Sequence, residues 1–176
     1  MTLTVEWRNG NSVLPEHSLM LIAFPGVGNV GKAAIDAVNS VNEATQVARL
    51  YDTSLPPLAC LDEDGLLAPP HYTLSSIEST TGKTILTLTG STQPVDPNSQ
   101  GMLANEIMKF FMQQGVSELV VMAGLGSEPS RKETFIVASN SSHRIELESR
   151  GVDVRRDEPS SGAIGLSALL ASRDRK

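Results

Sequence analysis

The sequence predicts an α/β protein: a three-layer sandwich with a mostly parallel central sheet and an antiparallel hairpin excursion. Two continuous apolar runs, HSLMLIAF and SELVVMAG, are typical of strands that are buried on both faces of a sheet. Segments with a helical spacing of apolar residues alternate with such strands along the chain. With 176 residues, of which 40% are apolar, we expect a single domain that covers residues 1–176.

The first predicted elements are a strand, a turn, a second strand and a helix. TLTVEWR alternates as a strand does, and Asn9-Gly10 is a turn signal before the second strand, HSLMLIAF. A helix with one buried stripe is predicted from Val27 onward, because apolar residues then recur at helical spacing. The residues of this predicted stripe are Val27, Val30, Ala34, Val38 and Val41.

The middle of the chain predicts a third strand, two hairpins and the clearest helix. ATQVARLY predicts the strand, and short alternating segments flank Asp64-Gly65 and Thr81-Gly82, as they do in antiparallel hairpins. DPNSQGMLANEIMKFFMQQG predicts the helix, because Asp96 can cap it, Pro97 suits its first turn and Gly115 can end it. The apolar face of this helix consists of Leu103, Ile107, Phe110 and Phe111.

The last part of the chain alternates between short strands and helices. SELVVMAG predicts a buried strand that leads into the glycine-rich segment GLGSEPS. TFIVAS and VDVRR predict two further strands, separated by a helix in SHRIELESRG that ends at Gly151. SSGAIGLSALLASRDRK predicts a terminal helix.

Composition and charge exclude several classes of protein. Fourteen Lys and Arg residues against 20 Asp and Glu residues give a net charge of −6, and the few aromatic residues are scattered, so we expect no nucleic-acid partner. No apolar run reaches about 18 residues and the N-terminus lacks a signal-peptide pattern, so we expect no membrane partner and a cytoplasmic location. Cys60 is the single cysteine, which excludes a disulfide within the chain.

The stretch LMLIAFPGVGNVGKAAI places Gly26, Gly28 and Gly31 at the G-x-G-x-x-G spacing of a dinucleotide-binding turn, after a strand and before a helix. Asp52 stands about 20 residues further on, where such folds carry the acid that binds ribose. However, the proline-rich segment TSLPPLACLDEDGLLAPP follows Asp52, where a dinucleotide-binding fold needs a second helix. The turn also lacks the GK[ST] ending of a phosphate-binding P-loop, so Lys32 is not a P-loop lysine.

We therefore favour a structural role for these glycines. Gly26 and Gly28 would supply the backbone angles of the turn, and Gly31 would let the helix pack close to the sheet. On this interpretation the turn binds no NAD, NADP or ATP, and the protein needs no cofactor. The alternative is a phosphate- or nucleotide-binding enzyme in which the backbone N–H groups of Gly26, Gly28 and Asn29 hold an anion, with Gly31 and Asp52 completing the site.

The other polar residues form no recognisable catalytic or metal-binding pattern. His17, His71 and His143 are far apart and lack the spacing of a zinc site, so we expect no metal. Ser167 lacks the G-x-S-x-G context of an activated nucleophile. The acidic residues in DEDG (62–65) and RRDE (155–158) lie in predicted turns, where solvated charge is the usual explanation. We therefore predict no catalytic residue.

Five segments occur along the chain in this order: LIAFPGVGNVGKAAIDAV, YDTSLPPLACLDEDGLLAPP, ILTLTGSTQP, LVVMAGLGSEPS and GAIGLSALL. This ordered set, which spans residues 19–170, resembles the proteasome assembly chaperone superfamily. The resemblance implies an α/β fold similar to that of nucleoside phosphorylases and peptidyl hydrolases. Some members of the superfamily have been linked to ATP-grasp ligases, but this sequence lacks the lysine, glutamate and metal-ligand constellation of such enzymes.

The resemblance also implies a non-enzymatic protein-binding module. The protein partners that it implies are proteasome α-subunits. Self-association into a homo-oligomer is expected, because such chaperones work as dimers or larger assemblies. Archaeal members often end in a hydrophobic-tyrosine-X tail that docks into the proteasome, whereas this chain ends in SRDRK, so we do not expect docking through the C-terminus.

Overall fold

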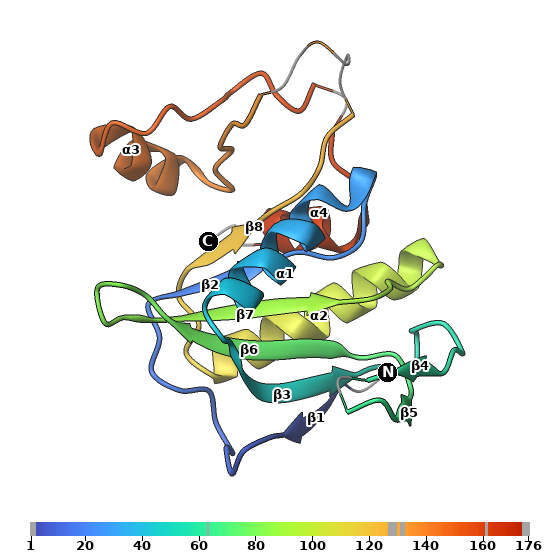
Figure 1. Ribbon diagram of the computed structural model, residues 1–176. Helices are drawn as coiled ribbons and strands as arrows, with labels where there is room; N and C mark the ends of the chain where they lie inside the picture. Colours follow the sequence, from blue (N-terminus) through green and yellow to red (C-terminus); the bar gives the residue numbers. More distant parts are fainter. Residues whose placement is uncertain (1–2, 63, 127–129, 131–132, 161, 174–176) are drawn as a thin grey trace.

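The computed structural model describes residues 3–62, 64–126, 130, 133–160 and 162–173, and it contains a six-stranded sheet with helices on both faces (Figure 1). The strands of this sheet lie in the order β1-β3-β6-β7-β2-β8, and β4 and β5 form a separate two-stranded sheet. The predicted α/β class is confirmed. The strands are β1 (Thr4–Trp7), β2 (Leu19–Ile22), β3 (Thr45–Tyr51), β4 (Cys60–Leu61), β5 (Leu67–Ala68), β6 (Tyr72–Glu78), β7 (Thr84–Gly90) and β8 (Leu119–Val121).

The sheet is mixed, which corrects the expectation of a mostly parallel sheet. Strand β2 pairs in parallel with β7 and β8, whereas β1 with β3, β3 with β6, and β6 with β7 pair antiparallel. The β6–β7 hairpin, which turns at Thr81-Gly82, lies inside the main sheet, and so short a connection permits only antiparallel pairing. The predicted excursion is the separate β4–β5 hairpin, which turns at Asp64-Gly65.

Helices cover both faces of the sheet and so produce three layers. Figure 1 shows α1 (Val30–Val41) on one face, and α2 (Pro97–Gln113) and α4 (Gly165–Ser172) on the other. The main core lies on the α2 side, where burial of apolar side chains supplies most of the driving force for folding. Its fully buried side chains include Met20, Ile22, Leu74, Leu86, Leu88, Leu103, Ile107 and Phe111.

Helix α1 buries only part of the stripe that its sequence predicts, since Ala34 and Val38 are half-buried. Its buried residues are Gly31 and Ile35. A short 3₁₀ turn, η1 (Val27–Asn29), precedes the helix, and left-handed backbone angles at Gly28 (φ 61°) and Asn29 (φ 52°) interrupt the helical phase. The helix therefore starts at Val30, and Val27 lies outside it. Three residues of the predicted stripe are more than half exposed: Val27, Val30 and Val41.

Helix α2 confirms the predicted start and end signals. The Asp96 side chain accepts a hydrogen bond from the backbone N–H of Ser99 (2.7 Å), and this bond holds the pKa of the Asp96 carboxyl below its usual range. Pro97 occupies the first helical position, and Gly115 follows the helix with a φ of 76°. All four residues of the predicted apolar face are buried.

The segment after β8 differs most from the prediction. TFIVAS and VDVRR meet in an isolated parallel bridge between Ile136 and Val154, and they form no extended strands. The predicted helix between them is present as α3 (Ser141–Ser149), where the Asn140 side chain accepts from the N–H of His143 (2.8 Å). Figure 1 shows α3 at the end of a segment that extends away from the main sheet. TFIVAS and VDVRR therefore have no edge strand of that sheet to pair with, whatever their β-propensity.

Parts of several predicted segments lie outside the described residues, among them residue 63 of DEDG, residues 127–129 of GLGSEPS, and residues 161 and 174–176 of the predicted terminal helix. Helix α4 (Gly165–Ser172) is shorter than predicted, because residues 160 and 162–164 are described but not helical. Within the described ranges, no helix is long and apolar enough to cross a membrane.

Two buried hydroxyl groups of the sheet provide a test of this packing. The Thr87 hydroxyl donates to the Asn39 side chain of α1 (2.9 Å), whereas the Tyr72 hydroxyl has no partner among the described residues. Burial raises the pKa of Tyr72 far above its usual value, so the phenol stays neutral. We predict that Tyr72→Phe leaves the free energy of unfolding unchanged or raises it by up to about 1 kcal/mol, and that Thr87→Val lowers it by about 1 kcal/mol.

Urea denaturation of the wild type and the two variants measures both changes. A loss of more than about 1 kcal/mol in Tyr72→Phe would contradict the prediction, because it would mean that the phenol is hydrogen-bonded in solution.

Candidate functional site

The loops that follow β2 and β7 meet the start of α4 at one end of the sheet, and a single side chain joins them. Gln93, which follows β7, donates from Nε2 to the carbonyl oxygen of Pro25, which follows β2. Its Oε1 atom accepts from the backbone N–H of Leu166 in α4 (2.8 Å). Ligands of open α/β sheets bind outside the carboxyl ends of the strands. This end of the sheet is therefore the candidate functional site.

The glycine turn after β2 is held in shape by its own residues. Gly28 has a φ of 61°, which favours glycine, so the predicted role of Gly28 in the turn is confirmed. Gly26 has a φ of −165°, an extended angle that any residue adopts, so the same role predicted for Gly26 is wrong. The N–H of Gly26 donates to the Asn29 side chain (3.3 Å), which leaves that donor engaged within the turn.

Two glycines let backbone segments meet directly. A Cβ atom on Gly31 would overlap the carbonyl group of Met122, so the predicted close packing of α1 at this glycine is confirmed. A Cβ atom on Gly124, in the loop after β8, would overlap the carbonyl oxygen of Val27 in η1. The sequence analysis missed Gly124, although the glycine-rich segment directly after a buried strand was a signal for close backbone approach.

The structure does not bring Asp52 to the glycine turn. Asp52 follows β3, and the sheet order places β6 and β7 between β3 and β2. At about 4.8 Å per strand, the two chain segments lie about 14 Å apart across the sheet. The Asp52 side chain instead accepts bonds from the N–H (2.8 Å) and the hydroxyl (2.5 Å) of Ser54.

A buried ion pair attaches the β4–β5 hairpin to the main sheet. Arg49 of β3 and Asp62 lie 3.2 Å apart, and their side chains are only 4% and 6% exposed. Asp62 also accepts bonds from the N–H groups of Leu66 (2.9 Å) and Asp64 (3.0 Å), and these bonds, together with Arg49, lower the pKa of its carboxyl. The expectation that the DEDG carboxylates are solvated charges is therefore wrong for Asp62, because a distant strand supplies its cation.

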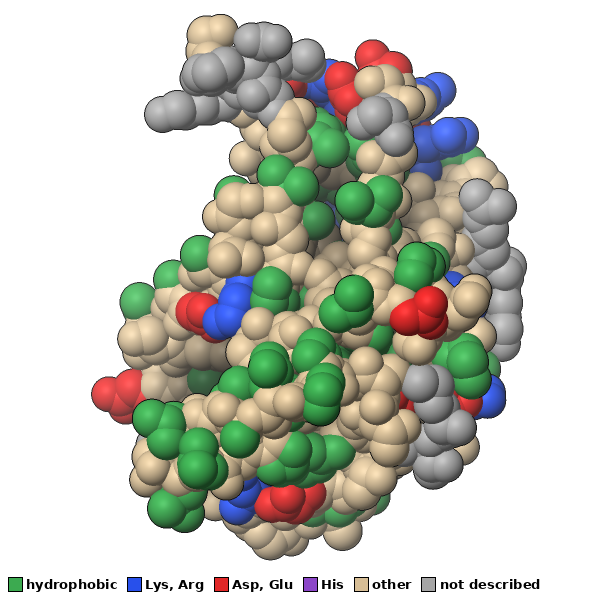
Figure 2. All heavy atoms as spheres, turned by 90° about the vertical axis from the view of Figure 1, so that its right-hand side faces the viewer, with side chains coloured by type: hydrophobic (Ala, Val, Ile, Leu, Met, Phe, Trp, Pro, Cys, Tyr) green, Lys and Arg blue, Asp and Glu red, His purple; other side chains and the backbone are tan. Residues whose placement is uncertain are grey.

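The hairpin presents an apolar surface to solvent. Leu61 and Leu67 are paired across β4 and β5, and they are 72% and 75% exposed. Figure 2 shows hydrophobic side chains gathered on the side of the molecule where Figure 1 places these strands. A hollow of about 390 Å³ lies beside the hairpin, and four of the ten residues that line it are prolines. We call this region the hairpin surface; it comprises Leu58, Leu61, Leu66, Leu67 and the prolines Pro56, Pro57 and Pro69.

The remaining candidates from the sequence lie apart from one another. His17 and His71 place ring nitrogens near the carbonyl oxygens of Pro15 (2.8 Å) and Pro69 (3.0 Å), whereas His143 lies on α3. Ser167 is buried in α4. Among the residues that the structure describes, no cluster of three His, Cys, Asp or Glu side chains could hold a metal ion.

In the RRDE turn, Arg155 pairs with Glu133 and Arg156 with Glu148 (2.7 Å). Both arginines therefore act within the segment that carries α3.

The fold and these loops define a mixed α/β sandwich. An apolar hairpin, which the Arg49–Asp62 ion pair attaches to β3, follows the carboxyl end of that strand. The chain belongs to the PAC2 family, whose model matches residues 20–175. The predicted resemblance is thereby confirmed. A relative from Methanocaldococcus jannaschii, the uncharacterized protein MJ1210, is 22% identical over 155 residues, which are 88% of this chain and 59% of that protein. The chain thus spans about three-fifths of the length of this relative.

Solved structures of similar fold come from archaea and bacteria. PbaB of Pyrococcus furiosus, described as an archaeal proteasome activator, has a TM-score of 0.77 and 20% identity, over 96% of this chain and 73% of that one. PbaA of the same organism, described as an archaeal homolog of proteasome-assembly chaperone, has a TM-score of 0.68 and 22% identity, over 97% and 66%. A PAC2 family protein from Streptomyces avermitilis has a TM-score of 0.64 and 21% identity, over 87% and 68%. These likenesses show the fold.

Two glycine substitutions test the close packing of the turn. We predict that Gly31→Ala destabilises the fold by about 1–3 kcal/mol, because its methyl group would displace the backbone at Met122. Gly26→Ala is the matched control: its nearest neighbour would be the Phe24 carbonyl oxygen at 3.8 Å, so we expect a change within about 0.5 kcal/mol. Thermal melts measure both variants, and equal melting temperatures would overturn the assignment.

The buried ion pair predicts a pH dependence of stability. Because the pKa of Asp62 is lowered on folding, the ionised carboxylate stabilises the fold above its ordinary pKa of about 3.9, and this contribution is lost as the pH falls through the lower folded value. Asp62→Asn removes the charge and keeps an acceptor oxygen. We expect this variant to melt at a lower temperature at neutral pH, and to lose less further stability than the wild type between about pH 5 and pH 2.

Asp64→Asn, an exposed substitution in the same turn, is the control and should follow the wild type. Parallel pH curves for Asp62→Asn and the wild type would show that the ion pair contributes nothing.

Proposed function

We propose that this chain is a non-enzymatic, cytoplasmic protein-binding module of the proteasome-assembly-chaperone type, formed by one α/β domain of residues 1–176. The observation that carries the proposal is the hairpin surface, where the paired leucines Leu61 and Leu67 are 72% and 75% exposed beside a hollow with four prolines in its wall. Contiguous apolar surface of this kind is characteristic of protein–protein interaction sites.

The hairpin surface is held rigidly, which favours binding. The Arg49–Asp62 ion pair attaches the hairpin to β3, and the prolines on both sides restrict the backbone. A surface that is already ordered loses less conformational entropy when a partner docks. The structure therefore supports recognition by a prearranged apolar face.

Proteasome α-subunits are the proposed partners. Membership of the PAC2 family supports this choice, as do the printed descriptions of PbaA and PbaB, which concern the proteasome. The apolar character of the hairpin surface fits a protein partner better than a polyanion, since four of its leucines are more than half exposed.

The alternative function is a phosphate- or nucleotide-binding enzyme with a phosphorylase- or hydrolase-like fold that uses the Gly26–Gly31 turn. Two of its donors are engaged within the turn: the N–H of Gly26 donates to the Asn29 side chain (3.3 Å), and the N–H of Asn29 donates to the carbonyl oxygen of Gly26 (3.0 Å). The Asp52 carboxylate accepts from Ser54 instead of lying at the turn. We therefore retain the prediction that the protein needs no cofactor. Calorimetric titration with NAD, NADP and ATP separates the two functions. Micromolar binding that disappears in a stably folded Gly28→Ala variant would favour the enzyme.

A binding experiment with purified proteasome α-subunits of the source organism tests the proposed function. We expect the wild type to bind and the double variant Leu61→Asp/Leu67→Asp to bind at least about tenfold more weakly. The partner would then have to bury two charged side chains in place of two leucines. Val41→Asp is the matched control, since Val41 is 81% exposed at the end of α1, outside the hairpin surface.

Circular dichroism establishes that all three proteins are folded. Equal binding by the wild type and the double variant would exclude the hairpin surface, and a source genome without proteasome genes would exclude this partner.

A further inference from the structure

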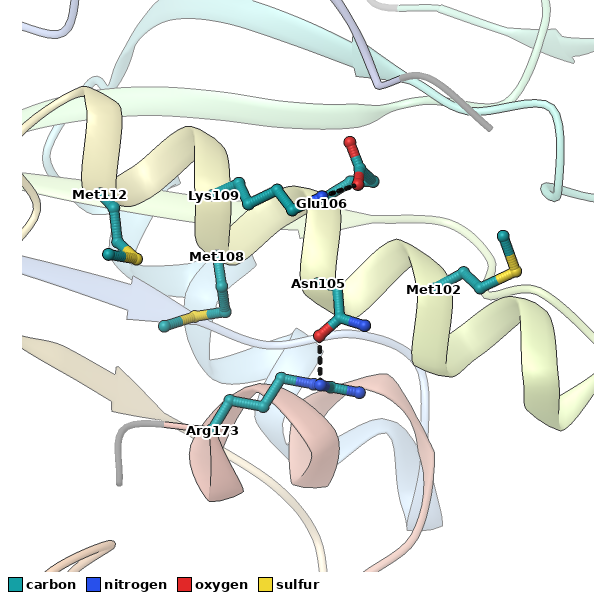
Figure 3. A pocket seen from close by; sticks show the side chains of 7 residues that line it. All are labelled: Met102, Asn105, Glu106, Met108, Lys109, Met112 and Arg173. Atoms are coloured by element: carbon teal, nitrogen blue, oxygen red, sulfur yellow. Dashed lines mark hydrogen bonds and ion pairs between the residues drawn. The ribbon is translucent and has the colours of Figure 1, made fainter. Parts of the chain in front are cut away.

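The outward face of α2 carries a second apolar surface, separate from the hairpin surface. While Leu103, Ile107 and Phe111 are buried in the core, Met102 and Met112 are 49% and 60% exposed. Glu106 and Lys109 lie between them, and their side chains pair at 2.7 Å (Figure 3). The four residues fall at helical spacing on one side of α2. We call them the methionine stripe: Met102, Glu106, Lys109 and Met112.

A shallow hollow of about 440 Å³ runs beside this stripe, between α2 and α4. Arg173, at the end of α4, donates to the Asn105 side chain and to the carbonyl oxygen of Gly101 (3.0 Å). Figure 3 shows the Arg173–Asn105 contact crossing from α4 to α2. Because α4 is tied to α2, the floor of the hollow is fixed while its methionine wall remains adaptable.

We propose that the methionine stripe is the interface between two copies of this chain, related by a two-fold axis that passes over the middle of α2. The charge pattern of the stripe carries this proposal. If two α2 helices pack antiparallel about a point between Ile107 and Met108, Glu106 of each copy faces Lys109 of the other copy. A two-fold interface makes every contact twice, so each helix supplies one partner to each of the two ion pairs.

The charges favour a second copy over an unrelated protein. The whole chain carries a net charge of −6, so two copies repel one another over most of their surface. The methionine stripe contains one acid and one base, so it is neutral and complementary to itself. Ion pairs of this kind fix orientation more than they add affinity, and the methionines supply the apolar contact.

The size of the stripe sets the expected strength of the dimer. Helix α2 has 17 residues and is therefore about 25 Å long, which is short for an interface that needs about 800 Å² on each copy. The hollow and the end of α4 extend the contact beyond the helix itself. We expect a dissociation constant on the order of micromolar.

Charge reversal tests the pairing directly, with light scattering and sedimentation velocity as the measurements. We expect the wild type to change from monomer to dimer with rising concentration. Lys109→Glu alone and Glu106→Lys alone place like charges opposite each other, so each should weaken dimerisation at least about tenfold. The double variant Glu106→Lys/Lys109→Glu restores complementary pairs and should recover the wild-type mass. A mixture of the two single variants should form a heterodimer.

The reciprocal rescue keeps the test independent of folding, because a merely structural defect in a single variant would not be repaired by mixing. A wild type that stays monomeric at high micromolar concentration would overturn the proposal. So would dimerisation that is unchanged in Lys109→Glu, or single variants that fail to associate when mixed. Leu61→Asp/Leu67→Asp should leave the dimer intact, so this proposal and the proposed partner binding fail or succeed separately.

Discussion

The close backbone contact between the glycine turn and the loop after β8 is the constraint on which the rest of the structure depends. Gly31 lets α1 approach the backbone of Met122, and Gly124 lets the opposite loop approach Val27. Close-packed interiors leave no room for a methyl group at such a contact. With α1 seated here, the loops after β2 and β7 meet, and Gln93 can bond to both Pro25 and α4.

The glycine turn illustrates why a local motif does not define a binding site. A strand, three spaced glycines, a helix and a later acid are all present, as in a dinucleotide-binding unit. Yet the next strand, β3, lies beyond β6 and β7 instead of beside β2. Insertion of the β6–β7 hairpin into the sheet separates Asp52 from the turn. Strand order, which depends on pairing between distant segments, therefore decides what the motif can do.

The Arg49–Asp62 pair shows a different use of buried charge. A buried ion pair adds little net stability, since desolvation offsets most of the attraction between the charges. Its value here lies in orientation, because it fixes the hairpin surface relative to the sheet. The methionine stripe on α2 differs in kind: its charges lie at the surface between flexible apolar side chains. One surface is rigid and apolar, and the other is adaptable and self-complementary.

The sequence by itself determined the features that depend on neighbours in the chain. The Asp96 cap, Pro97 and Gly115 define α2, and Asp64-Gly65 and Thr81-Gly82 turn the two hairpins, because capping and turn formation involve residues only a few positions apart. The family was also predictable, because its signal is an ordered set of such segments.

Only the tertiary structure decided which segments meet. It set the mixed strand order, turned α1 so that Gly31 and Ile35 are buried, and denied TFIVAS a partner strand. It also buried Asp62 against Arg49, although DEDG resembles a solvated turn. Each of these outcomes depends on a residue far away along the chain. Periodicity and local propensity describe only neighbouring residues, so they cannot predict that distant partner.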